Sequence, residues 1–342
     1  MSPSRLLFAA CLLGAVLVTA SLGIAHPPGV LVMDSRGNLY FSDLSSVWVL
    51  RPDGRTEIVV PRVHTHELWL GPGDTLYGED VTNVGDDYRH RVWKLAPDGE
   101  LSDQIPWRDG FPDDYHDYGF NRDSAGLTYV LRRSERAVEV LDESGALVRT
   151  VSLQGFEGFI HWLTVSSDSR LHVGVGADLL TVAPGRTRAE LVASGLIERT
   201  AEFDWVHDRH ALMGMWSDPS GNVYVSVYSG QVLKRVSPSG EVSVAARSPG
   251  DWSPVGGMVS ADGVVWILEW SGSNEVRVRR LHALFELLRV STRQGRIAAR
   301  NARLARTKQR LGSRRLPTPG PPGAAGNCPP RARREVRLPA WF

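Results

Sequence analysis

A unit of about 40 residues recurs six times between residues 29 and 281, and this repeat limits the possible folds more than any other feature. Each copy contains an apolar strand, a turn with Asp, Gly or Asn, and an alternating strand centred on one large side chain. The clearest copies are GVLVMDSRGNLYFSD (29–43), LMGMWSDPSGNVYVSVY (212–228) and GGMVSADGVVWILEW (256–270). The large central side chains, which we call anchors, are Tyr40, Tyr77, Tyr129, His172, Tyr224 and Trp266.

Most anchors are followed by a second hairpin with its own turn signal, as in VWVLRPDGRTEIVV (47–60). Its Asp-Gly pair suits a hairpin turn, where Gly adopts a positive φ without steric cost. Four short strands per unit at this period are typical of a propeller blade. A β-sandwich with coincidental turns would not repeat one four-strand order six times. The sequence therefore predicts an all-β fold, a six-bladed β-propeller of four-stranded antiparallel blades over 26–281.

The sixth unit supplies three expected strands, at 256–260, 264–270 and 275–281, but no clear fourth. An open ring would expose a sheet edge, which proteins avoid. Two segments can complete this blade, Phe285–Ser291 after it or Val16–Ile24 at the start of the chain.

The repeats resemble NHL repeats and the wider six-bladed group that includes the senescence-marker-protein/gluconolactonase and strictosidine-synthase-like propellers. The segment 29–54 carries the resemblance, with an apolar strand and Asp-x-x-Gly-Asn-Leu-Tyr before a second hairpin. The resemblance covers about 250 residues and implies the fold, whereas the function stays open because such propellers serve as enzymes and as binding scaffolds. The acidic residue that a gluconolactonase-like site needs on the first inner strand is replaced by Gly29–Val30.

The N-terminus, residues 1–25, has the pattern of a secretory signal peptide. Arg5 precedes an apolar run without charge, and small residues at Ala20 and Ala25 offer cleavage sites. Export to the periplasm or the medium is therefore expected. The run from Leu6 to Ala25 is also long enough to span a bilayer uncleaved, so a membrane anchor is the alternative.

The charges are segregated along the chain. Residues 277–342 carry 17 Lys and Arg against 2 Asp and Glu, whereas the preceding 276 residues carry 22 basic and 36 acidic residues. The tail, 282–342, is expected to form a basic helix followed by a disordered Pro-rich stretch. Such a tail can contact an anionic membrane or polysaccharide, dock on its own acidic body, or remain solvated. No nucleic-acid partner is expected, because export separates the chain from nucleic acid.

Blade geometry places the start of each inner strand and the end of the second strand at one mouth of the central channel. His66 and His161 occupy equivalent inner-strand starts, and His210 lies just before another. Acidic groups follow the second strands at Asp43, Asp80 and Glu269. Loops on a rigid scaffold commonly carry function, so we expect a site at this mouth.

Imidazole and carboxylate groups that converge on a partly desolvated channel suit a divalent metal or general acid–base catalysis. The predicted metal ligands are His66, His161 and His210, for one zinc or calcium ion. The candidate catalytic residues are His66, Glu67, Asp80 and Glu269. The amidating-lyase relatives of NHL proteins use channel histidines on zinc, which supports this interpretation by analogy. The alternative is that His66 and His161 only bind backbone groups at the rim.

Two further segments near the mouth are unusual. The stretch PWRDGFPDDYHDYGF (106–120) is expected to expose aromatic rings among carboxylates, which suits sugars or cations. The insertion 198–214 can cover the mouth as a lid, and Glu79 and His90 are expected in a long loop on the same face. The candidate ligand-binding residues are Asp43, Trp107, Tyr118 and Arg132.

These observations favour an exported propeller that binds a small polar ligand or a protein at the channel mouth. The alternative is a metal-dependent lyase or hydrolase of lactonase-like type. The sequence contains no Gly-rich phosphate loop, no nucleophile elbow and no His-Glu-x-x-His motif, so kinase, dinucleotide-dependent and α/β-hydrolase functions are unsupported. The two cysteines, Cys11 and Cys328, cannot form a Cys-based zinc site.

Overall fold

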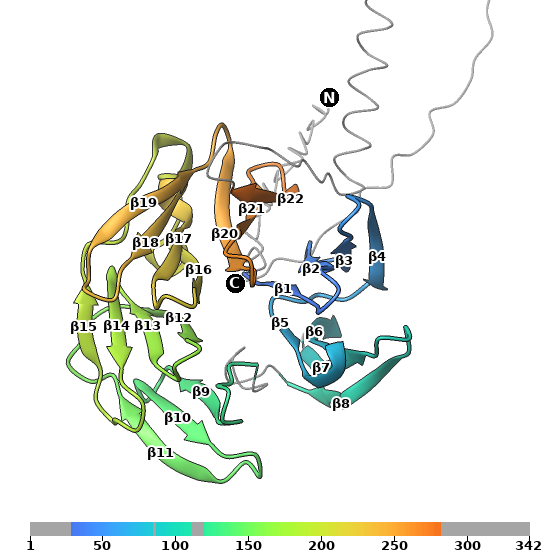
Figure 1. Ribbon diagram of the computed structural model, residues 1–342, viewed down its shortest axis with the longest axis horizontal. Coiled ribbons are helices and arrows are strands. Elements are labelled where there is room, and N and C mark those ends of the chain that lie inside the picture. The colour runs from blue at the N-terminus through green and yellow to red at the C-terminus, as the bar shows by residue number, and fades with distance from the viewer. Residues whose placement is uncertain (1–28, 85–86, 111–119, 282–342) are drawn as a thin grey trace, which may run out of the picture. The chain divides into compact units, whose positions relative to one another are not determined.

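The computed structural model describes residues 29–84, 87–110 and 120–281. Strands β1 to β22 of this part form six antiparallel sheets around a common axis (Figure 1). The predicted six-bladed β-propeller is confirmed. The sequences predicted to be the signal peptide (1–25) and the basic tail (282–342) lie outside the described residues.

Each sheet is one blade, and the strands follow one another from the axis outward. In the first half of the ring, blade 1 comprises β1 (Leu31–Met33), β2 (Leu39–Ser42), β3 (Ser46–Leu50) and β4 (Thr56–Pro61); blade 2 comprises β5 (Leu68–Leu70), β6 (Leu76–Val84), β7 (Asp87–Leu95) and β8 (Leu101–Asp109); blade 3 comprises β9 (Thr128–Arg132), β10 (Ala137–Leu141) and β11 (Leu147–Ser152). In the second half, blade 4 comprises β12 (Ile160–Val165), β13 (Leu171–Val175), β14 (Asp178–Val182) and β15 (Glu190–Ala193); blade 5 comprises β16 (Leu212–Ser217), β17 (Val223–Val227), β18 (Val232–Val236) and β19 (Val242–Arg247); blade 6 comprises β20 (Trp252–Val259), β21 (Val265–Ser271) and β22 (Val276–Leu281). Short 3-10 helices lie between strands, namely η1 (Pro72–Asp74), η3 (Ala201–Phe203), η4 (Asp208–His210) and η5 (Tyr228–Gly230).

Blades 3 and 6 show three strands within the described ranges. In blade 3, the backbone N–H of Tyr129 on β9 donates to the carbonyl of Asn121, 2.8 Å away, so the chain just before β9 runs beside it at the inner position. In blade 6, the three expected strands are confirmed. Both segments proposed as its fourth strand, Phe285–Ser291 and Val16–Ile24, lie outside the described residues.

A carboxylate cap explains the repeated Asp and Tyr of the motif. Asp34 Oδ1 accepts the backbone N–H groups of Arg36 and Asn38 in the turn, while the Tyr40 hydroxyl donates to Asp34 Oδ2 over 3.1 Å. The same Asp–Tyr bond joins Asp123 to Tyr129 in blade 3 (3.0 Å) and Asp218 to Tyr224 in blade 5 (3.5 Å). Each cap fixes the turn between the inner and second strands, because it satisfies the turn's N–H groups.

The apolar core is a series of clusters, each shared by two neighbouring blades. Val138 of blade 3 packs with Leu163 of blade 4, and Leu179 of blade 4 packs with Val225 of blade 5. Blades 1 and 2 share a cluster that includes Trp93, and Tyr224 of blade 5 joins a cluster with Ile267 of blade 6. A blade therefore buries its two faces only between its neighbours, as in other repeat architectures.

The inner strands approach one another closely at the axis. Val30 of blade 1 forms a parallel bridge with Gly257 of blade 6, which closes the ring. Beside this bridge, a side chain at Gly256 would overlap the carbonyl oxygen of Gly29, and one at Gly214 would overlap that of Val255. Blades 1, 5 and 6 thus meet backbone to backbone, a contact that only glycine permits.

We expect Gly256→Ala to destabilise the protein strongly, by about 3 kcal/mol or more, because the new methyl group has no room at the closure of the ring. Gly272→Ala is the matched control, since a Cβ at this exposed glycine meets nothing within 4 Å. Urea unfolding of the two variants measures the difference. Equal stabilities would contradict the tight backbone contact at the axis.

Candidate functional site

Two faces of the ring carry different loops. The inner strands begin on one face, the mouth face, where the second strands also end; the opposite face, the turn face, carries the Asp–Tyr caps. The mouth face holds the residues that the sequence selected as candidates. Their positions follow from the register, for example Leu68 opposite Gly78 in blade 2 and Pro254 opposite Glu269 in blade 6.

The most enclosed polar cluster of the mouth face lies in blade 2. Glu79 on β6 is fully buried, and its carboxylate accepts the backbone N–H groups of His66 and Glu67, with the His66 Nδ1 atom 3.2 Å from Oε1. Burial, assisted by the neighbouring carboxylate of Glu67, raises the pKa of Glu79 well above its usual value. Burial also lowers the pKa of His66 to about 4, so its imidazole is neutral at pH 7.

The expectation of a long loop around Glu79 and His90 is wrong. These residues lie on β6 and β7, which form one extended hairpin from Leu76 to Leu95. A nine-residue strand can run through this stretch because its alternating side chains, such as buried Val81 and Val92, still face the core. Glu79 is therefore part of the sheet, and its buried carboxylate accepts hydrogen bonds from the backbone of the neighbouring inner strand start.

His64 and Asp80 complete the cluster. The His64 Nδ1 atom lies 3.0 Å from the carbonyl oxygen of Leu44 in blade 1, and its ring contacts that of His66 edge to face at 4.6 Å between centroids. Asp80 accepts the backbone N–H of His64 over 2.9 Å and is paired with the guanidinium of Arg91 at 3.0 Å. Asp80 therefore orients the His64–Glu67 segment.

Glu269 of blade 6 is fully buried and paired with two arginines. Its carboxylate accepts the Ser248 hydroxyl and the Arg277 Nε–H, both at 2.5 Å, and lies 2.8 Å from Nη2 of Arg279. Arg277 is also stacked on Trp252, with 4.2 Å to the ring centroid. Removal of one partner from such a buried ion pair typically costs about 3–5 kcal/mol, because it leaves the other charge buried and unpaired, so Glu269 is held in place by its arginines.

The predicted metal ligands occupy different blades. His161 on β12 and His210 in η4 belong to blades 4 and 5, and η4 packs against β12, whereas His66 is on blade 2. His161 has its Nε2 atom 3.0 Å from the carbonyl oxygen of Gly176, and its buried Nδ1 atom has no partner among the described residues. Burial lowers the pKa of His161 to about 4. The described ranges contain no group of three or more His, Cys, Asp or Glu arranged to hold a metal ion, so the metal site stays a prediction.

The candidate ligand-binding residues are placed as follows. Asp43 accepts the Trp48 indole N–H at 2.8 Å and closes the β2–β3 turn through the backbone N–H of Ser46. Arg132 is paired with Glu139 at 2.9 Å. Trp107 lies on strand β8, where the Arg91 guanidinium covers its ring at 4.8 Å. Tyr118 lies outside the described residues.

Two aromatic rings on the mouth face remain exposed. Phe159, just before β12, is 41% exposed and lies under the Arg133 guanidinium; Trp205, in the insertion before β16, is 43% exposed. Trp205 is stacked on buried Phe203 at 6.0 Å, and its indole N–H donates to the carbonyl of Glu202. Phe203 in turn contacts Tyr228 edge to face, so the insertion is fixed to blade 5.

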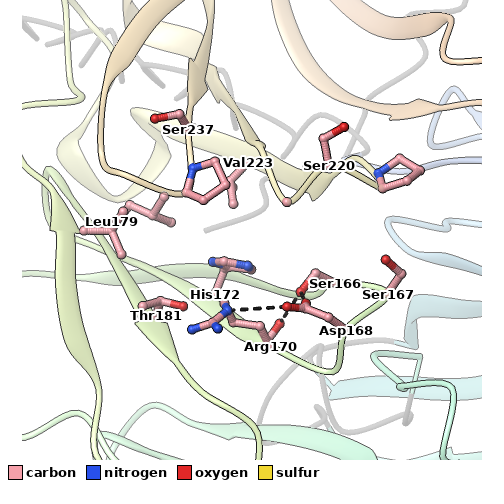
Figure 2. Close-up of a pocket in the computed structure, with 14 residues that line it drawn as sticks. Ser166, Ser167, Asp168, Arg170, His172, Leu179, Thr181, Ser220, Val223 and Ser237 are labelled. Atoms are coloured by element: carbon pink, nitrogen blue, oxygen red, sulfur yellow. Dashed lines mark hydrogen bonds and ion pairs between the residues drawn. The ribbon is translucent and has the colours of Figure 1, made fainter.

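A polar cavity of about 330 Å³ lies between blades 4 and 5, on the turn face (Figure 2). The anchor His172 lies at its centre, with Thr181 to one side and Ser166 and Asp168 to the other, and Ser220, Val223 and Ser237 of blade 5 lie opposite. The sequence marked His172 only as an anchor. One feature of the sequence does mark this blade as different, because Ser166 and His172 stand where the cap of other blades has Asp and Tyr.

We expect the free energy of unfolding to fall as the pH is lowered from 6.5 to about 5. Burial lowers the pKa of His64 to about 3, and that of His66, His161 and His172 to about 4. In this pH range the unfolded chain binds protons that the folded chain does not, so acid favours unfolding. Glu79 acts in the opposite sense. Its raised pKa means that the folded chain keeps a proton that the unfolded chain has lost, so its contribution to the free energy of unfolding decreases as the pH rises. The four histidines outweigh this one carboxyl group.

Urea unfolding at several pH values measures this dependence, and His161→Gln should reduce the slope by up to about 1.4 kcal/mol per pH unit. A slope that is unchanged in this variant would show that His161 titrates normally in the folded protein.

The comparisons with known proteins found similar solved structures. No family model matches the chain, and no curated protein matches it. A solved streptogramin B lyase is 16% identical and covers 78% of this chain and 86% of its own, with a TM-score of 0.46. A catalytically inactive virginiamycin B lyase from Staphylococcus aureus is 12% identical (80% and 85% covered, TM-score 0.47), and a gluconolactonase from Xanthomonas campestris is 12% identical (71% and 84% covered, TM-score 0.44). The six-bladed architecture itself is established by the strand order of the structure.

Proposed function

We propose that the protein is an exported binding scaffold that holds a protein partner on the mouth face of its propeller. The observation that carries this proposal is the contrast between two kinds of side chain on that face. The acidic groups that suggested catalysis, such as Asp80 and Glu269, are bound within the protein, whereas Phe159 and Trp205 remain exposed. The same face could instead bind a small polar ligand at the channel mouth, which would also make the protein a binding scaffold.

The acidic groups support binding over catalysis. Asp43 closes a turn, Asp80 is held by Arg91, and Glu269 is held by two arginines. A general base must be able to reach the proton that it removes, and a carboxylate that already accepts several internal bonds is poorly placed for this. The same bonds fix the loops of the mouth face in one conformation, which lowers the entropy lost on binding.

The exposed aromatic rings supply the binding energy. Tryptophan and arginine are enriched among the residues that dominate protein interfaces. Trp205 is supported from below by Phe203, and Phe159 is covered by Arg133, so both rings are held in place before a partner arrives. Other large apolar side chains with comparable exposure, such as Leu147 and Leu191, lie on the outer strands β11 and β15.

Export is part of the proposal and rests on the N-terminal apolar segment. Among the residues that the structure describes, no helix has the length and apolarity to cross a membrane. The segment from Leu6 to Ala25 lies outside these residues. We propose a periplasmic or secreted protein, with retention of this segment as a membrane anchor as the alternative.

We expect Trp205→Ala to weaken the capture of a specific exported partner by roughly tenfold or more, the loss typical of an interface hot spot. The measurement is cross-linking of the purified protein to exported proteins of the source cells, followed by reconstitution with the purified partner. Leu191→Ala is the control, because this side chain is at least as exposed as Trp205 but lies on the outer strand β15. A partner profile that is the same for both variants would contradict the proposal.

A metal-dependent lyase or hydrolase is the second candidate. The unpartnered Nδ1 atom of buried His161, beside η4 with His210, supports it. We expect the protein purified without chelator to contain about one equivalent of zinc or calcium, which His66→Ala and His161→Ala would both lose. Elemental analysis of the three proteins measures this. A protein that holds no metal, even after metal is added, would leave the binding scaffold as the only function.

A further inference from the structure

We propose that the cavity between blades 4 and 5 is a second binding site, which takes a neutral, hydroxyl-rich ligand of the size of one sugar ring and holds it through His172. The cavity opens near the turn face, away from Phe159 and Trp205. The inference therefore does not depend on the function proposed for the mouth face.

The cavity exists because blade 4 departs from the repeat. The anchor and the residue opposite it form an aromatic pair in two other blades. Trp69 and Tyr77 are tilted with 4.8 Å between centroids, and Trp216 and Tyr224 are stacked with 5.8 Å between centroids. The corresponding pair in blade 4 is Thr164 and His172. Of this pair His172 lines the cavity, where its imidazole is smaller than the tyrosine or tryptophan ring of the other anchors.

His172 is unlike a structural histidine. Its side chain lines the cavity, only 5% of the residue is exposed, and neither ring nitrogen has a hydrogen-bond partner among the described residues. Buried polar atoms nearly always have partners, and an exception indicates a missing group. Burial lowers the pKa of His172 to about 4, so at pH 7 the neutral ring offers one donor and one acceptor to a ligand.

The walls favour a neutral ligand with several hydroxyl groups. Ser167, Ser220 and Ser237 also line the cavity. The two charged residues of the wall neutralise each other, since Arg170 lies 3.6 Å from Asp168. The pair gives this part of the wall no net charge that would favour an anion or a cation, whereas a hydroxyl group can donate to the carboxylate or accept from the guanidinium.

The size and the apolar part of the wall agree with a sugar ring. Small-molecule pockets range from about 300 to 1,000 Å³, and this cavity lies at the lower end. Pro219 and Pro238 from two turns of blade 5, with Val192 of blade 4, supply flat apolar surface for the C–H face of the ring. The cavity thus combines the two kinds of contact that a sugar needs.

The test uses a panel of free monosaccharides, including glucose, galactose, mannose and N-acetylglucosamine, with phosphate and acetate as anionic probes. Saturation-transfer NMR and calorimetry measure binding to the full-length protein. His172→Tyr restores the anchor of the repeat and fills the cavity, so we expect it to keep or raise the thermal stability and to weaken sugar binding by at least tenfold. This combination separates loss of the site from loss of the fold.

Ser220→Ala removes one wall hydroxyl from an exposed turn and should weaken binding severalfold. Ser144→Ala is its matched control. Ser144 lies in an Asp-Glu-Ser-Gly turn of blade 3 (142–145), away from the cavity, which resembles the Asp-Pro-Ser-Gly turn of Ser220 in blade 5 (218–221). Binding of no sugar in the panel would overturn the proposal and leave a water-filled cavity. Sugar binding that persists in His172→Tyr, or preferential binding of phosphate or acetate, would overturn it as well.

Discussion

The close approach of backbone to backbone at the axis is the constraint on which the remaining structure depends. Gly29, Gly214 and Gly256 let the inner strands of blades 1, 5 and 6 come together without side chains between them. The parallel bridge from Val30 to Gly257 then joins the first blade to the last. Because the ring closes so tightly, groups near the axis lose their water and have to find partners within the protein.

This loss of water explains the chemistry of the mouth face. Glu79 and Glu269 are both fully buried, yet they are accommodated in different ways. Glu269 is neutralised by two arginines, whereas Glu79 accepts backbone N–H groups and has a raised pKa. The polar residues that suggested catalysis are thus largely the means by which the blades are fixed at the axis. The side chains that remain available to a partner are the exposed rings of Phe159 and Trp205.

The fold could be predicted from the sequence because the repeat is local. Where the Asp–Tyr cap is present its residues lie within seven positions, so one cap such as Asp34–Tyr40 specifies one turn, and the period specifies six blades. The site could be predicted only in part. Its location at the inner-strand starts followed from the same period, but the partners of each group did not. Ser248 and Glu269, or His64 and Leu44, are brought together by the ring and share no local pattern.

The Asp–Tyr cap alternates around the ring. It is present in blades 1, 3 and 5, while the position of the aspartate holds Gly71, Ser166 and Ser260 in blades 2, 4 and 6. By this measure the molecule has approximate threefold symmetry, with a pair of blades as its unit. A designed ring made of six identical capped blades would be more regular, but every interface would then be filled alike. The cavity of this protein lies beside blade 4, one of the three blades without the cap.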